Sequence, residues 1–475
     1  MAGLGVLALA MINVAAMVSP RNLPMMAEYG WSLIFFVLVA VILFLIPVSL
    51  AISELATAWP RRGGVYPWVK EAFRGRAGFL AVWCDWSENL VWFPTVLSFT
   101  AASLAYAIDP ALANSKIFLV SVMLAILWGA TLAAFRGVGA TSAIGAIGTI
   151  LGAIVPAILV IVLGVAFLAD GRESNIPFSG DALIPNLGLT NLAFLAGAIL
   201  MFAGMEMAGY HADQSRNPGR DFPRAILLAA VIMVVFTILG SLALAVIVPQ
   251  HEISLVGGVM QAFQAVFDDL GVGWLLAPTA ILVTIGGVAH MVPWIIGPAT
   301  GLAEVAAQGE MPKGLAKENA AGSPTRILLI QAIGGSLFSL LFLFIPSVST
   351  SYWILSVLTA QIIIILYALI FAAVLRLRYT HPEVPRPYRI PGGIVGVWIV
   401  AVVGLFGSAL SFVLGFVPPD QLKTGNPVVY VLGIMIGLAI LALPPFLFRA
   451  HPPDAGAQRF PASGGPAPAS SLGGD

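Results

Sequence analysis

Long apolar segments, one after another down to about residue 448, are the feature that most constrains this chain. Only 9% of its 475 residues are charged and 59% are hydrophobic. A soluble protein of this length carries far more charge, so a soluble fold is excluded. A helix that crosses a bilayer needs roughly 20 apolar residues. By that criterion the sequence predicts an all-α membrane protein with twelve transmembrane helices, over residues 4–29, 31–58, 78–107, 116–135, 143–168, 190–214, 224–248, 272–306, 326–345, 350–377, 394–416 and 427–448.

Basic residues collect on one predicted side of the membrane. If the connections alternate between the two sides, all but four of the 22 Lys and Arg residues fall on the side of both termini; the exceptions are Arg21, Lys116, Arg172 and Lys423. Cytoplasmic loops are rich in Lys and Arg. We therefore predict a multi-pass protein of the cytoplasmic (inner) membrane with both termini cytoplasmic. Residues 1–448 would form one domain, and the Pro-, Gly-, Ala- and Ser-rich residues 449–475 a disordered cytoplasmic tail.

Composition also narrows the possible partners and activities. The net charge is zero, which gives no reason to expect nucleic acid, and the single Cys84 cannot form an internal disulfide. No cluster of cysteine and histidine suggests a metal, so neither a metal nor another cofactor is expected. The run that opens the chain has no basic leader and no cleavage site, so no cleavable signal is expected. The five histidines are scattered, which disfavours an intramembrane enzyme. A channel would need a continuous polar pore or charged rings, and neither is evident.

A short motif occurs twice. "GGVYPWVKEAF" (63–73) and "GGVMQAFQAVF" (257–267) share Gly, Gly, Val and Phe at an offset of 194 residues. Each copy lies between the second and third helices of a five-helix unit, on opposite predicted sides of the membrane. An inverted-topology repeat leaves this pattern. We predict repeat one over about 4–168 and repeat two over about 190–377, with two peripheral helices over about 394–448.

The first helix of each unit is predicted to be broken. In "MVSPRNLP" (17–24), Pro20 removes a backbone donor and disfavours helix at Ser19. In "FAGME" (202–206), Gly204 weakens the helix just before an acid. Broken helices at matching places in two repeats predict a substrate site near the midplane, where freed N–H groups can bind a carboxylate and freed carbonyls an ammonium. The alternative is a packing glycine and a proline kink, both common in membrane helices.

Ionisable residues accompany these breaks. Glu206 follows the second break, Arg21 follows the first, and Asp85 and Glu88 lie inside the third helix. An ion at mid-bilayer costs about 3 kcal/mol or more, so such groups face cavities, pair or become neutral. The excess of acid leaves room for protons or a substrate ammonium. Structural roles are the alternatives: Glu206 could cap the broken backbone, Asp85 and Glu88 could form a hydrated cluster, and Arg21 could extend outward or pair with Glu88.

Several further motifs occur in order along nearly the whole chain: "PRRGGVYPWVKEAF" (60–73), "GME" (204–206) with "NPGRDFPRA" (217–225), "WIIGP" (294–298) and "RPYRIPGG" (386–393). Together they resemble the motifs of the amino acid–polyamine–organocation superfamily of transporters. Within the superfamily, "GWSLIFF", "IPVSLAISELAT" and "NPGRDFP" are most similar to the glutamate–GABA antiporter family. The resemblance implies the five-plus-five inverted-repeat fold and alternating access to a small amino acid. The tail does not resemble the pH-sensitive plug of the enterobacterial glutamate–GABA antiporter, so acid gating is not implied.

The resemblance also implies roles for individual residues. Trp294 would close over the substrate or else simply pack, Glu206 would serve gating or proton coupling, and Tyr367 matches an aromatic position of helix 10. The charge argument adds Arg21 and Glu88 to the substrate site and Asp85 to coupling or gating. The residues that would line the unwound parts of helices 1 and 6 are Met17, Val18, Ser19, Phe202, Ala203, Gly204 and Met205.

Together these features predict a secondary active amino-acid transporter, with exchange of glutamate, GABA or a related amino acid as the leading hypothesis. Proton-coupled symport of another amino acid is the alternative. Arg21 favours a substrate with a second carboxylate, whereas the acids favour a cationic or zwitterionic one. The expected partners are a small amino acid and the lipid bilayer, with protons and a second copy of the chain as further candidates.

Overall fold

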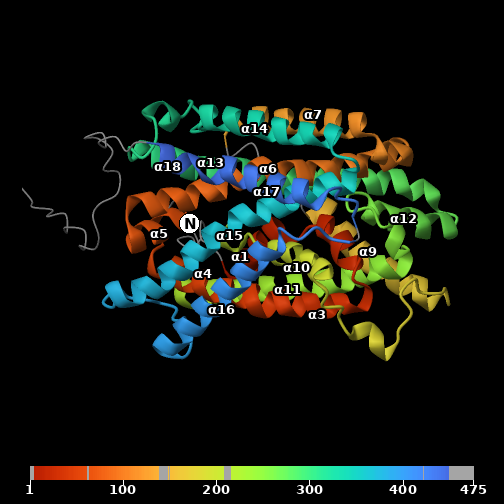
Figure 1. Cartoon of the computed structure of the whole chain (residues 1–475), viewed down its shortest axis with the longest axis horizontal. Helices are drawn as coiled ribbons and strands as arrows, with labels where there is room; N and C mark the ends of the chain where they lie inside the picture. The colour runs from red at the N-terminus through yellow and green to blue at the C-terminus, as the bar shows by residue number, and fades with distance from the viewer. Residues whose placement is uncertain are drawn as a thin grey trace, which may run out of the picture.

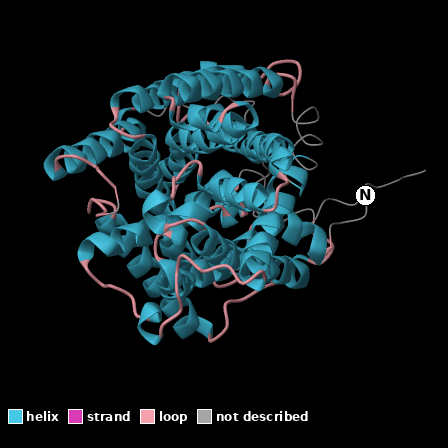
Figure 2. Ribbon diagram, turned by 90° about the vertical axis from the view of Figure 1, so that its right-hand side faces the viewer, coloured by secondary structure: helices cyan, strands magenta, loops and turns pink. Residues whose placement is uncertain are grey.

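The structure, a computed structural model, describes residues 5–60, 64–137, 148, 150–207, 215–420 and 422–448. These residues form helices joined by turns and loops, with no β-strand among them (Figures 1 and 2). The predicted tail, 449–475, lies outside the described residues. The α-helices are α1 (Val6–Met17), α2 (Leu23–Ala27), α3 (Leu33–Ala40), α4 (Ile46–Ala58), α5 (Val65–Phe73), α6 (Gly75–Ile108), α7 (Lys116–Ala134), α9 (Val155–Ala169), α10 (Leu189–Met201), α11 (Pro218–Ile247), α12 (Gly258–Asp269), α13 (Leu276–Ala307), α14 (Thr325–Phe344), α15 (Val348–Thr380), α16 (Gly393–Leu414), α17 (Pro427–Ala442) and α18 (Pro444–Leu447). Two π-helical segments, η3 (Val41–Leu45) and η5 (Ile150–Ile154), and short 3-10 turns complete the described helices.

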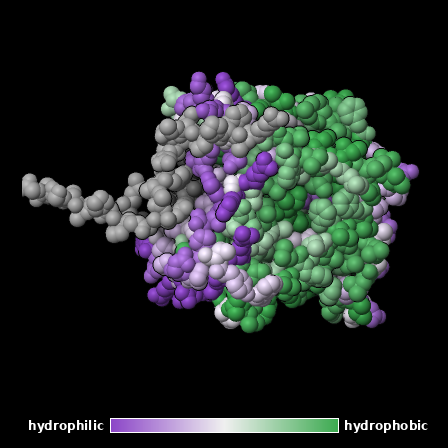
Figure 3. Space-filling model, turned by 60° about the vertical axis from the view of Figure 1, so that its left-hand side comes forward, coloured by the Kyte–Doolittle hydropathy of each residue, from purple (hydrophilic) through white to green (hydrophobic). Residues whose placement is uncertain are grey.

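The surface agrees with a membrane protein. A broad apolar face covers the side of the bundle, and hydrophilic side chains gather towards its ends (Figure 3). Among the described residues, ten helices are long and apolar enough to cross a membrane. The first predicted helix is not one of them because it is divided, and the last, α17, has only 16 residues because Pro444 and Pro445 follow it. The all-α membrane class is therefore confirmed, whereas the count of twelve and the repeat remain predictions.

One helix starts earlier than its apolar run. The sequence predicted a helix from residue 224, but α11 begins at Pro218, with Asn217 before it. Proline is favoured in the first turn of a helix, where its missing N–H costs nothing. The polar first turns extend beyond the apolar stretch, so hydrophobicity alone placed the boundary too late.

The two copies of the repeated motif both form short helices. The first copy contains α5 and the second lies largely in α12, and these helices lie at opposite ends of the bundle (Figure 1). This placement agrees with the predicted inversion between the two halves.

Each π-helical segment comes just before a proline. Pro47 follows η3 by two residues, and Pro156 follows η5 in the same way. Proline has no N–H, and its ring crowds the carbonyl one turn earlier, so a wider turn relieves the conflict. Two bilayer-spanning segments are therefore locally widened, at places that the prolines determine.

Glycines allow one very close helix crossing. A Cβ on Gly286 of α13 would overlap the backbone of Gly152 in η5, and a Cβ on Gly152 would overlap the backbone of Gly286. The two helices therefore touch backbone to backbone, which only glycine on both sides permits.

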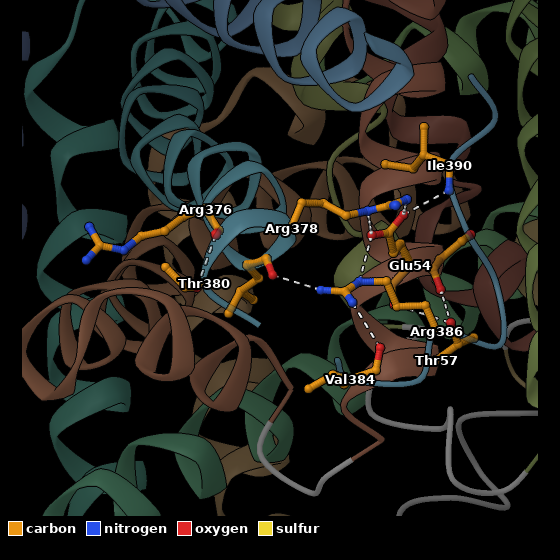
Figure 4. Close-up of polar contacts among 10 residues, drawn as sticks. Glu54, Thr57, Arg376, Arg378, Thr380, Val384, Arg386 and Ile390 are labelled. Carbon is orange, nitrogen blue, oxygen red and sulfur yellow. Dashed lines mark hydrogen bonds and ion pairs between the residues drawn. The ribbon is translucent and has the colours of Figure 1, made fainter. Parts of the chain in front are cut away.

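A buried carboxylate joins α4 to the segment that connects α15 and α16 (Figure 4). Glu54 accepts hydrogen bonds from Arg378 Nε and Nη2, both at 2.6 Å, and from the backbone N–H of Ile390 at 2.8 Å. Arg386 Nε forms an ion pair with it at 3.3 Å. The acid therefore holds the end of α4 against Arg378 at the end of α15 and against Arg386 in the following loop. We call this group the Glu54 clasp.

Breaking the clasp should destabilise the protein. Glu54→Ala leaves two arginines without their buried acid, and such losses typically cost about 3–5 kcal/mol. We expect a clearly lower thermal unfolding midpoint in detergent and a lower yield of monodisperse protein. Glu252→Ala, at an exposed acid, is the matched control. Equal unfolding midpoints for the two variants would contradict a structural role for the clasp.

Candidate functional site

The two predicted breaks are confirmed, and they face each other. Helix α1 ends at Met17, and Val18 and Ser19 are extended before the 3-10 turn η1 (Pro20–Asn22). Helix α10 ends at Met201, and Gly204 has φ +113°, a conformation that other residues rarely adopt. A Cβ on Gly204 would lie 3.3 Å from both Met17 and Trp294. The breaks are therefore in direct contact, with Trp294 of α13 against them.

A small cavity lies at this junction. Its volume is about 30 Å³, which leaves room for only a few water molecules. A free amino acid does not fit, so the site must widen to admit one. The lining residues are Met17, Arg21, Asn22, Glu88, Trp92, Leu200, Met201, Ala203, Gly204, Glu206, His290, Trp294 and Ile363.

Glu206 is held by one of its two carboxylate oxygens. Oε2 accepts the N–H of Gly204 at 3.2 Å and a short hydrogen bond from the Tyr367 hydroxyl. The same hydroxyl accepts the N–H of Gly204 at 2.7 Å. Oε1 is buried and has no hydrogen-bond partner among the described residues. One oxygen therefore caps the broken backbone, while the other remains available to a proton or a substrate ammonium.

Arg21 lies among aromatic rings. Its guanidinium donates a short hydrogen bond to Thr95 Oγ1 and lies 5.4 Å from the ring centre of Trp92 and 6.0 Å from that of Tyr352. A cation over an aromatic face is stabilised by the ring quadrupole. Arg21 is 5% exposed, so it points into the protein and does not extend outward. It shares the cavity with Glu88 and Glu206.

The structure brings most of the predicted site residues together. Met17, Arg21, Glu88, Ala203, Gly204, Glu206 and Trp294 line the cavity. Val18 and Ser19 line a smaller one of about 10 Å³ beside it, which Met17 also lines. Tyr367 reaches the site through Glu206. Asp85, Phe202 and Met205 are buried but do not line either cavity.

Sequence reasoning missed several contributors. Trp92 lies one helical turn after Glu88 on α6, and Asn22 directly follows Arg21. Their spacing from these two charged residues could have predicted both. His290 also lines the cavity, with its ring centre 5.6 Å from that of Trp92. Thr95 and Tyr352 carried no local signal.

The site combines groups of both charges with aromatic rings. A buried cation and two buried acids surround the cavity, and tryptophan rings cover part of it. Trp92 and Trp294 have ring centres 5.2 Å apart. No group here forms a nucleophile–base pair with an activated Ser or Cys, as far as the described residues extend.

Fold and site together define a polytopic helical membrane protein with a small polar site between two broken helices. A family model described as amino acid permease matches residues 4–440. The chain therefore belongs to the amino acid permease family, and it is a transporter and not an enzyme. The superfamily resemblance is confirmed.

Relatives agree with this assignment. The chain is 37% identical to an uncharacterized transporter of Legionella pneumophila over 445 residues, covering 94% of this chain and 96% of the relative. It is 28% identical to a glutamate/gamma-aminobutyrate antiporter of Lactococcus lactis, covering 89% and 86%. A probable agmatine/putrescine antiporter of the same species is 25% identical, covering 81% and 83%.

Proposed function

We propose that this chain exchanges glutamate, GABA or a closely related amino acid across the cytoplasmic membrane by alternating access, with both termini cytoplasmic. The single observation that carries the substrate class is the buried cation Arg21 in one cavity with Glu88 and Glu206. An amino acid can pair a carboxylate with Arg21 and its ammonium with one of the two acids. The similarity to a glutamate/gamma-aminobutyrate antiporter supports the same substrate class.

Proton-coupled symport is the second candidate. The unpartnered Oε1 of Glu206 favours it, because a buried carboxylate oxygen at a broken helix can take up a proton in one conformation and release it in another.

Uptake into proteoliposomes separates the two functions. Exchange predicts saturable uptake of labelled glutamate that rises many-fold when the vesicles contain unlabelled GABA or glutamate. Symport predicts uptake into empty vesicles that an inward proton gradient drives. The controls are protein-free vesicles and an unrelated internal solute. An uptake rate that does not depend on the amino acid inside the vesicles would contradict exchange. The absence of saturable amino-acid uptake would overturn the proposed substrate class.

The indole of Trp294 should contribute to substrate affinity. It lies against Gly204 in the cavity wall, and stacking on a substrate ammonium is worth about 0.5–2 kcal/mol. Trp294→Ala should therefore raise the half-saturation concentration for uptake by about tenfold, since 1.4 kcal/mol is a factor of ten. Trp294→Phe should recover most of the affinity.

The matched control for Trp294 is Trp128→Ala. Trp128 is on α7, where its indole donates to Ser336, and it does not line the cavity. If Trp294→Ala has a normal half-saturation concentration, Trp294 only packs against its neighbours and does not bind the substrate.

A further inference from the structure

A second, larger cavity lies outside the site, on the outer side of the bundle. Its volume is about 440 Å³, and its walls are the η3–α4 segment on one side and α11 on the other. The lining residues Ile46, Leu227, Val231 and Val235 are 49–65% exposed, so the cavity is a groove open to the surroundings. In a membrane protein those surroundings are lipid.

The length of the groove corresponds to one leaflet. Its lining runs from Val41 to Ser53 on the first wall and from Pro223 to Val235 on the second. At roughly 1.5 Å per residue, each wall is about 18 Å long. Half of a hydrocarbon core is about 15 Å. The groove therefore extends from one end of the bundle to about mid-membrane, and the widened turn η3 lies at its inner end.

The end of the groove that lies away from mid-membrane is basic. Arg224 lines it together with Tyr388. Arg220 precedes Arg224 by one helical turn on α11, and Arg389 follows Tyr388 in the chain. Arg224 is exposed and forms no hydrogen bond or ion pair with any residue that the structure describes. An apolar groove of leaflet length that ends at an unneutralised cation has the polarity of a phospholipid with an anionic headgroup.

We propose that this groove binds an anionic phospholipid, with an acyl chain along η3, α4 and α11 and its phosphate at Arg224 and the Tyr388 hydroxyl. Tyr388 lies two residues before Ile390, whose N–H binds Glu54. The bound lipid therefore connects α11 to the segment that the Glu54 clasp holds. This site is separate from the cavity at the helix breaks and does not depend on the proposed substrate.

Native mass spectrometry of the purified full chain can test this proposal. Phosphatidylglycerol and phosphatidylcholine with identical acyl chains are the two probes. The wild-type protein should retain phosphatidylglycerol at least tenfold more than phosphatidylcholine. Arg224→Gln should remove that preference, and Arg136→Gln, at an exposed arginine beyond the end of α7, should keep it.

A second variant tests the apolar wall of the groove, which would contact the acyl chain. Ala230 is 8% exposed and lines the groove, so Ala230→Phe should fill it and reduce the retention of both lipids. The thermal unfolding midpoint of each variant checks that it is folded. Equal retention of the two lipids by the wild type would overturn the proposal, as would an unchanged preference in Arg224→Gln. A dimer that Ala230→Phe dissociates, with no lipid preference, would assign the groove to a second copy of the chain instead.

Discussion

Arg21→Ala is expected to lose transport of dicarboxylic amino acids while keeping part of the transport of monocarboxylic ones. The guanidinium is the cation that lines the cavity, and hydrogen bonds to a charged group are worth about 1.5–3 kcal/mol. The loss for glutamate should therefore be roughly 10- to 100-fold in uptake efficiency. Arg21→Lys should recover only part of it, because lysine cannot hold a carboxylate through two parallel hydrogen bonds.

Removing the Arg21 side chain should not leave its hydrogen-bond partner unpaired. Thr95, the hydrogen-bond partner of Arg21, also donates to the carbonyl of Trp92 at 2.7 Å, so its hydroxyl keeps a partner when the arginine is removed. If Arg21 instead pairs with Glu88 during the transport cycle, each single variant should be unstable and Arg21→Ala/Glu88→Gln partly rescued. An equal loss of all substrates with normal stability would contradict both roles.

Glu206→Gln is expected to preserve the fold but to reduce coupled transport at least tenfold and to flatten its dependence on pH between about 5 and 8. The amide oxygen of glutamine can still accept the two hydrogen bonds that Oε2 accepts from Gly204 and Tyr367. What disappears is the group that can take up a proton or neutralise an ammonium. The measurements are initial uptake rates across this pH range and the thermal unfolding midpoint.

Tyr367→Phe is the companion to this variant. It removes the hydroxyl that binds Glu206 and Gly204 but leaves the acid in place, so the pH profile should shift and not flatten. Unchanged uptake of the Glu206→Gln protein across the whole pH range would leave Glu206 with its capping role alone.

The sequence predicted the part of the site that backbone chemistry determines. The backbone of Pro20 cannot donate a hydrogen bond, and a glycine such as Gly204 readily adopts the positive φ found there. Both breaks could therefore be predicted from the sequence. Glu206 stood out because an acid inside an apolar run is costly without a purpose. Helix positions followed from hydrophobicity, with errors where a polar turn extends α11 and where prolines shorten α17.

The surroundings of Arg21 could not be predicted in the same way. Its neighbours Thr95 and Tyr352 come from α6 and α15, far away in the sequence. Only the packing of the bundle brings them to the first break. The roles of Asp85, Phe202 and Met205 remain predictions, since burial alone does not distinguish a coupling residue from a packed one.

The contact between Gly152 and Gly286 has a consequence for how the specificity of this transporter could change. An alanine at either position would push the two helices apart. Trp294 lies eight residues after Gly286 on the same helix, about 12 Å away along the axis, so the displacement would reach the cavity wall. A shift of about 1 Å in a positioning group can change a rate a hundredfold. New substrate preferences can thus arise from a single methyl group at a residue that does not line the cavity.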